Sequence, residues 1–181
     1  AEVGLWRHLD TPYFQRHTAD EIAWHARHLY WRVDRTEPVV KARLPHIGEE
    51  GLQVMIYTPD QPHLFARLCG FFSRLGYNIA EAKIHTTRHG YALDSFMLLD
   101  PDGTLAYRDM ISLIEHDLSA RLASGAVPEK AASGRLSRKV RNFPITPEVQ
   151  IRRTEKPGQC LLSIIAADRP GLLYTVASTL D

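Results

Sequence analysis

The turn sequence Asp-x-Pro-x-Leu occurs twice in this chain, each time after an apolar run and before an amphipathic one. The first copy begins at Asp60 and the second at Asp168, and 168 minus 60 gives a spacing of 108 residues. An apolar run that continues through such a turn into an amphipathic segment predicts a strand followed by a helix. The chain is therefore predicted to contain a repeated unit and a linker between its copies.

Both turns also predict a position that favours anions. Backbone N–H groups at the start of a helix, together with the positive end of the helix dipole, suit a small carboxylate or another anion. The second copy ends at Asp181, about one helix after its turn, and the chain does not begin with Met. We therefore expect the chain to be a fragment.

The composition is that of an ordinary soluble globular protein, with 44% hydrophobic and 24% charged residues. The net charge of +1 gives no general reason to expect nucleic acid or an acidic membrane as a partner. No apolar run approaches the ~20 residues that span a bilayer. Cys69 and Cys160 show no metal-ligand spacing, so we expect reduced thiols and a cytoplasmic protein.

Residues 1–35 are predicted to be helical. Thr18 and Glu21 have the spacing of a capping box, in which a hydroxyl and a carboxylate satisfy free N–H groups reciprocally. Apolar residues then recur at helical spacing, namely Ile22, Ala26, Leu29 and Val33. Such a helix cannot bury its apolar face alone, so we expect it to pack on a preceding domain or on the sheet domain that follows.

The central part of the chain predicts a β-α-β-β-α order. Residues 36–51 contain two prolines and two glycines, which predict a connector with one short strand around Val39 and Val40. The elements that follow are a strand over 52–58, a helix over 62–75, a hairpin of strands over 77–88 and 91–99, and a helix over 108–122.

One strand is missing from this order if it is to complete a ferredoxin-like α+β unit. Residues 123–142 predict a basic linker, and the alternating segment from Val149 to Arg153 is our candidate for the late fourth strand. The first domain is therefore predicted over residues 52–153. The start of a second copy is predicted over residues 159–181.

A resemblance to a known family rests on four stretches: 13–18 with 22–25, 60–65, 82–88 with 92–96, and 168–173. With the βαββα order they resemble the ACT family, small regulatory domains that bind amino acids. More specifically, the chain resembles the C-terminal region of the bifunctional uridylyltransferase/uridylyl-removing enzymes of bacterial nitrogen control. The resemblance implies a βαββαβ ACT domain, with residues 1–35 as the helical tail of a preceding HD-type domain.

The resemblance further implies a parent with a nucleotidyltransferase domain, a metal-dependent hydrolase domain and two ACT domains. Such a parent adds and removes uridylyl groups on the signalling protein PII under the control of glutamine, and it uses Mg²⁺ or another divalent metal. The fragment is expected to lack the transferase site and to hold no cofactor. ACT–ACT pairing within or between chains is expected.

The resemblance also suggests where the ligand binds, because in such domains it commonly lies between two ACT units. One site would be formed by Asp60, Gln61, Pro62, His63 and Leu64. The other would be formed by Asp168, Arg169, Pro170, Gly171 and Leu172, with Asn78 and Ile79 on the facing strand. The alternative interpretation is structural, with each aspartate capping its helix and each proline in the first turn. The two roles are compatible.

The two turns differ at the glycine position of the family, which is His63 in the first copy and Gly171 in the second. Glycine lets a backbone approach a ligand closely, whereas a histidine side chain fills that space or adds a titratable donor. We therefore expect the second copy to be the better ligand site.

The nine histidines raise the hypothesis of a metal site, with His8, His17, His25 and His28 in the N-terminal segment. A metal site needs a carboxylate or further histidines at a compatible geometry, so we predict packing or surface histidines and no metal. An RNA-binding sheet would need an aromatic signature that this sequence lacks. Two alternatives to amino-acid sensing stay open: a remnant of a metal-dependent phosphohydrolase and a ligand-free structural pairing module.

Overall fold

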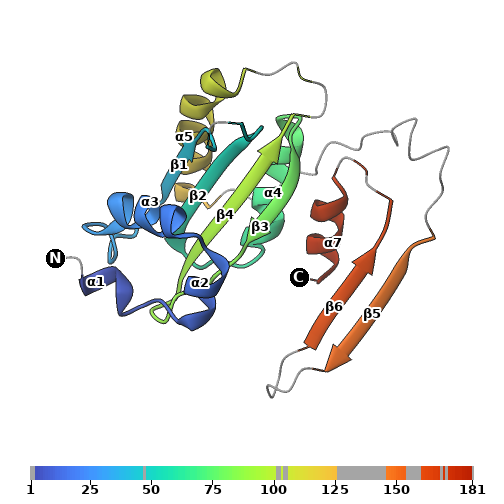
Figure 1. Ribbon diagram of the computed structural model, residues 1–181, viewed down its shortest axis with the longest axis horizontal. Helices are drawn as coiled ribbons and strands as arrows, with labels where there is room; N and C mark the ends of the chain where they lie inside the picture. The colour runs from blue at the N-terminus through green and yellow to red at the C-terminus, as the bar shows by residue number, and fades with distance from the viewer. Residues whose placement is uncertain are drawn as a thin grey trace.

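The main sheet has four antiparallel strands, β1 (Val39–Arg43), β2 (Leu52–Pro59), β3 (Asn78–Lys83) and β4 (Tyr91–Leu99). Their order is β1-β2-β4-β3 (Figure 1). This computed structural model describes residues 3–46, 48–100, 103, 106–125, 146–153, 160–167, 169 and 171–180. Helix α4 (Leu64–Arg74) follows β2, and α5 (Tyr107–Ala123) follows β4. The predicted βαββα order and the ferredoxin-like α+β class are confirmed.

Helices cover both faces of this sheet (Figure 1). Strand β2 is buried over nearly its whole length, and its side chains alternate between two cores. Val54 and Ile56 pack with α4 and α5, whereas Met55 and Tyr57 pack with the N-terminal helices. An antiparallel sheet often leaves one face to solvent, and here the N-terminal segment closes that face.

The N-terminal segment forms α1 (Val3–Trp6), α2 (Thr11–Arg16) and α3 (Ala19–Leu29). The capping box is confirmed: the Glu21 N–H donates to Thr18 Oγ1 at 3.2 Å, and the Thr18 N–H donates to Glu21 Oε2 at 2.7 Å. This segment was expected to pack on a preceding domain or on the sheet domain, and in the structure it packs on the sheet domain. Tyr13 and Leu29 are buried in the second core, and this burial holds the N-terminal segment against the sheet.

The fourth strand of the sheet comes from the N-terminal side. Strand β1 pairs with β2, whereas β5 (Glu148–Arg153) pairs with β6 (Cys160–Ile165) in a separate two-stranded sheet. The prediction that Val149 to Arg153 would complete the first sheet is therefore wrong. The physical reason is that β1 lies one short connection away from β2 and buries its valines, while β5 is exposed along its length.

The repeat is larger than the turn sequence alone indicates. Strand β2 begins at Leu52 and β6 at Cys160, and 160 minus 52 is again 108. Helix α4 begins at Leu64 and α7 (Leu172–Leu180) at Leu172, the same spacing. Because β1 precedes β2 as β5 precedes β6, the repeated unit is β-β-α. Helix α7 contacts α4, so the two copies meet through their first helices (Figure 1).

Part of the predicted organisation falls outside the described residues. Of the basic linker predicted over 123–142, the structure describes the first three residues, Ala123 to Gly125. Within the described part of the chain, no helix combines the length and the apolar character that a membrane crossing requires.

Candidate functional site

The first turn, from Asp60 to Leu64, is held by hydrogen bonds within the turn and to Gly90 and Arg67. The Asp60 N–H donates to the Gly90 carbonyl oxygen at 2.9 Å, and Asp60 Oδ1 accepts from the Gln61 N–H at 3.0 Å. The Gln61 side-chain oxygen accepts from Arg67 at 2.6 Å. The N-cap of α4 is His63, without a side-chain cap, so Asp60 is not the N-cap of that helix. Pro62 is exposed and Leu64 is buried.

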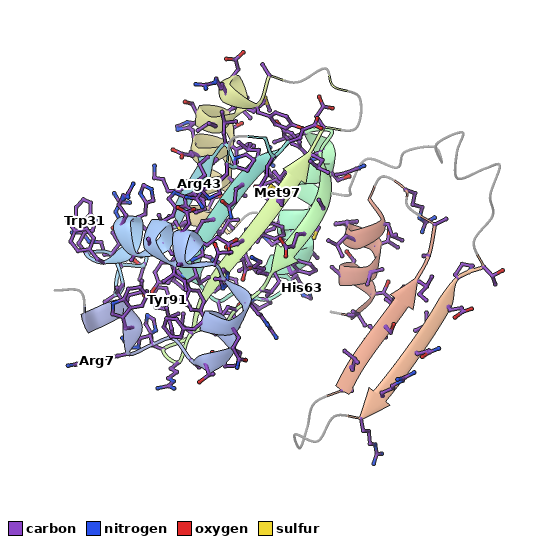
Figure 2. The ribbon with its side chains drawn as sticks, in the orientation of Figure 1. Arg7, Trp31, Arg43, His63, Tyr91 and Met97 are labelled. Carbon is purple, nitrogen blue, oxygen red and sulfur yellow. The ribbon has the colours of Figure 1, made fainter. Side chains whose placement is uncertain are left out.

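His63 lies at the start of α4 (Figure 2) and has a left-handed backbone, with φ of 57°. Gly171, its equivalent in the second copy, has φ of 75°. Among the described residues, His63 is the one non-glycine residue with positive φ. The turn therefore requires a left-handed residue directly before its helix, which glycine adopts readily and other residues adopt at a cost.

A cavity of about 430 Å³ lies between α4, β3 and the beginning of α7. It brings together the predicted facing residues Asn78 and Ile79 with Arg169, Gly171 and Leu172 of the second turn. Residues 60–64 of the first turn do not line this cavity. Asp168 and Pro170, also predicted for this site, lie outside the described residues.

Two hydroxyl groups in the cavity lining were not among the predicted site residues. Ser73 Oγ and Tyr77 Oη are buried and have no hydrogen-bond partner in the described part of the chain. Burial raises the pKa of Tyr77 to about 12, so its hydroxyl stays protonated at neutral pH and can donate a hydrogen bond. A buried hydroxyl without a partner is costly, and a polar ligand that reached these two groups from the cavity would satisfy them.

Backbone N–H groups at the start of α7 add hydrogen-bond donors to the same cavity. The first α-helical bond of α7 runs from the Thr175 N–H to the Gly171 carbonyl oxygen at 3.0 Å. The N–H groups of Leu173 and Tyr174 precede that bond, and the described residues provide no acceptor for them. Both residues line the cavity. With the cationic Arg169 they make this end of the cavity suitable for a carboxylate.

A second polar cluster joins the N-terminal segment to the sheet. Tyr13 Oη and His25 Nδ1 are hydrogen-bonded at 2.7 Å, and His25 Nε2 lies 3.2 Å from Ser95 Oγ on β4. The His17 Nδ1–H donates to the Tyr13 carbonyl oxygen at 2.9 Å. Burial lowers the pKa of His25 to about 3, so its ring is neutral at physiological pH. His17 and His25, which raised the metal hypothesis, thus act as packed neutral residues.

A buried carboxyl lies on the other face of β4. Asp94 is opposite Ile56 in the sheet, and its Oδ1 accepts from the His85 N–H at 3.3 Å. Burial raises the pKa of Asp94 to about 7, and the negative charge of Asp60 adds to this shift. The stretches 13–25 and 82–96, which carry the family resemblance, meet on the opposite face of β4, where His25 contacts Ser95.

Comparison with known proteins matches two parts of the chain to family models. Residues 1–28 match the model described as "Uridylyltransferase GlnD fifth domain", and residues 53–106 match the ACT domain. The ACT match covers β2, α4, β3 and β4. The assignment of residues 1–35 to the tail of an HD-type domain stays a prediction. No solved structure matches the chain.

Curated relatives match along almost the whole chain. A bifunctional uridylyltransferase/uridylyl-removing enzyme of Aromatoleum aromaticum is 57% identical over 99% of this chain and 21% of its own length. Its counterparts in Chromobacterium violaceum and Ralstonia nicotianae are 54% and 50% identical, each over 99% of this chain and 21% of the relative. The chain belongs to this family. It spans about a fifth of the length of the curated relatives it matches.

Within this uridylyltransferase family, the chain is an ACT-bearing region. The segment that matches the fifth-domain model is the one that packs on the ACT sheet through Tyr13 and His25. The ACT domain and the preceding helices therefore form one packed unit.

Proposed function

We propose that this chain is the amino-acid-sensing regulatory region of a bifunctional uridylyltransferase/uridylyl-removing enzyme, and that its ligand is glutamine. The observation that carries the proposal is the cavity between the two repeats, lined by the start of α7 and by Ser73 and Tyr77, whose buried hydroxyls have no partner among the described residues. Its volume, about 430 Å³, falls in the range of about 300–1,000 Å³ that is typical of small-molecule sites.

Each part of glutamine has a matching part of the cavity in this proposal. The α-carboxylate binds at the start of α7, where Arg169 and the N–H groups of Leu173 and Tyr174 gather. The side-chain amide hydrogen-bonds with Ser73 and Tyr77, whose hydroxyls can donate and accept. The apolar side chains of the lining contact the methylene groups; they include Ile79, Leu99 and Leu172.

Ligand binding would couple the two repeats, because the cavity walls come from both. A ligand that contacts α4, β3 and α7 together stabilises the arrangement in which these elements meet, by its differential affinity for that arrangement. In the whole protein this shift would bias the balance between uridylylation and deuridylylation of PII. The fragment itself contributes no transferase site in this proposal, and any divalent metal for that chemistry would be held elsewhere in the parent.

The experiment is thermal unfolding of the chain with each common amino acid, for the wild type, Ser73→Ala and Tyr77→Phe. Tyr30→Phe is the matched control, since Tyr30 is exposed on the N-terminal segment. A ligand at ~100 times its dissociation constant stabilises the folded state by about 2.7 kcal/mol. We expect a shift with glutamine that Tyr77→Phe reduces and Tyr30→Phe retains. A melting temperature that no amino acid changes would overturn the sensing proposal.

ACT–ACT pairing is a second candidate function, favoured by the two-stranded sheet. One face of its strands exposes large apolar side chains, namely Val149, Ile151 and Ile164. A further ACT unit, within the same chain or from another, would cover them. Sedimentation velocity tests this: Ile151→Lys should reduce any self-association, and unchanged association would exclude this surface.

A further inference from the structure

Three segments that are distant in the sequence bring two imidazoles and a carboxylate together. His8 lies between α1 and α2, Asp34 follows α3, and His89 lies in the connection from β3 to β4. One ligand atom from each residue lies within 4.8 Å of the others. The rings of His8 and His89 are 3.7 Å apart between centroids. Two nitrogen donors and one oxygen donor are thus gathered at one point.

The hydrogen bonds around His89 identify its protonated nitrogen. The Tyr57 hydroxyl donates to the Val33 carbonyl oxygen at 2.6 Å, so its proton is already engaged. His89 Nε2 lies 3.0 Å from Tyr57 Oη and 3.2 Å from the same carbonyl oxygen. Because both neighbours then act as acceptors, Nε2 carries the ring proton and donates it to them.

The other ring nitrogen of His89, Nδ1, therefore carries a lone pair and no proton. His89 Nδ1 is buried and has no hydrogen-bond partner among the described residues. A histidine that binds a metal through one nitrogen commonly donates its other N–H to a carbonyl oxygen, which fixes the tautomer and the ring orientation. His89 has this arrangement already, through Val33.

We propose that His8, Asp34 and His89 bind one Zn²⁺ or a similar divalent transition-metal ion. Imidazole nitrogens with one carboxylate are ligands that zinc accepts, whereas Mg²⁺ and Ca²⁺ prefer oxygen. Three protein ligands leave one tetrahedral position for water. This site is separate from the cavity between the repeats, so it does not depend on the proposed amino-acid sensing.

The backbone already holds the ligands near one another. The Arg88 N–H donates to the His8 carbonyl oxygen at 2.9 Å, which ties the α1–α2 connection to the hairpin. The His89 ring stacks on Tyr91 at 4.5 Å, and Figure 2 shows Tyr91 among the N-terminal helices. A bound ion would therefore fasten the N-terminal segment to the β3–β4 connection of the ACT domain.

The histidines of the N-terminal segment predict no metal site when they are compared with one another alone. The proposed site takes only His8 from that segment's beginning, and its other ligands lie 26 and 81 residues further on (34 minus 8 and 89 minus 8). No sequence motif of fixed spacing connects them.

The test is zinc binding by the tag-free chain, measured by competition with a chromophoric chelator and by metal content after desalting. The background carries Cys160→Ser, because the exposed Cys160 thiol is a competing ligand. We expect one Zn²⁺ per chain and, at ~100 times the dissociation constant, a melting temperature higher by about 5–10 °C. Co²⁺ in place of Zn²⁺ should give the visible absorption of a tetrahedral site.

The variants are His8→Ala, Asp34→Asn and His89→Ala, with His116→Ala as the control for an exposed histidine on α5. Each ligand variant should weaken zinc binding by about a hundredfold or more, since loss of a supporting residue alone costs about 10–100-fold. His116→Ala should bind as the wild type does. Asp34 is exposed, so Asp34→Asn keeps the test valid if His89→Ala unfolds. Absent stoichiometric binding, or unchanged affinity in His8→Ala or Asp34→Asn, overturns the proposal.

Discussion

Glu21 on helix α3 and Lys83 on strand β3 form an ion pair, with Lys83 Nζ 2.8 Å from Glu21 Oε1. Their side chains are 10% and 16% exposed, and Glu21 Oε1 also accepts from Gln53 Nε2 at 2.9 Å. This pair joins the segment that matches the fifth-domain model to the ACT sheet. It lies on the same side of the sheet as the Tyr13–His25–Ser95 hydrogen bonds.

Removing one partner of this pair should destabilise the fold strongly. Lys83→Met leaves the Glu21 carboxylate mostly buried without its cation, and we expect a loss of about 2–4 kcal/mol in the free energy of unfolding. Lys41→Met is the matched control, because the Lys41–Glu115 pair is more exposed, at 34% and 25%. Its loss should stay below about 1 kcal/mol. Urea unfolding measures both, and equal losses would contradict the importance of the Glu21–Lys83 pair.

The buried His25 predicts a loss of stability in acid. Burial holds its pKa near 3, below the ordinary value of 6.5, and the positive charges of Arg43 and Lys83 act in the same direction. The unfolded chain therefore binds the proton first, so the contribution is complete above pH 6.5 and falls toward pH 3. The slope is about 1.4 kcal/mol per pH unit. Urea unfolding at a series of pH values should show this slope, reduced in His25→Gln and retained in His116→Gln.

Asp94 predicts the opposite dependence. Burial raises its pKa to about 7, so the folded state holds the proton more tightly than the unfolded chain. The stability that this provides is complete below about pH 4 and is lost as the pH rises through 7. Asp94→Asn keeps an oxygen for the His85 N–H and carries no charge. We expect it to stabilise the protein by on the order of 2 kcal/mol at pH 8 and by much less at pH 5. Equal effects at both pH values would refute a neutral Asp94.

The left-handed turn residues predict opposite effects of glycine and alanine. His63→Gly should be more stable than His63→Ala by about 1 kcal/mol, because glycine adopts positive φ without the Cβ clash. Gly171→Ala should destabilise the second turn by about 1–2 kcal/mol. Thermal unfolding of the three variants measures both differences. An alanine variant at position 63 that is as stable as the glycine variant would argue against the observed backbone conformation.

Local patterns in the sequence predicted much of the fold. The β-forming residues of Leu52 to Thr58, the helical spacing after Pro62 and the Thr18–Glu21 capping box are local signals, and the structure confirms each. The fourth strand was assigned wrongly because pairing is a tertiary event. A short strand around Val39 and Val40 was predicted, but two valines do not indicate which strand they pair with. In the structure this strand, β1, pairs with β2 at the edge of the sheet.

The candidate site was predictable only in part, for a similar reason. The doubled turn indicated Arg169, Gly171 and Leu172, and the family resemblance indicated the facing Asn78 and Ile79. Ser73 and Tyr77 carry no such signal, because a hydroxyl becomes informative only when packing leaves it buried without a partner. The His8–Asp34–His89 group likewise exists only after the three segments have met.

Amide chemical-shift mapping with glutamine locates the proposed ligand site. We expect saturable shifts at Ser73, Tyr77 and the first residues of α7, which Tyr77→Phe weakens and Tyr30→Phe leaves unchanged. Glutamate and asparagine, which differ in charge or length, should shift the same amides less. Shifts confined to the first turn at Asp60 to Leu64, or no saturable shift at all, would contradict a glutamine site between the two repeats.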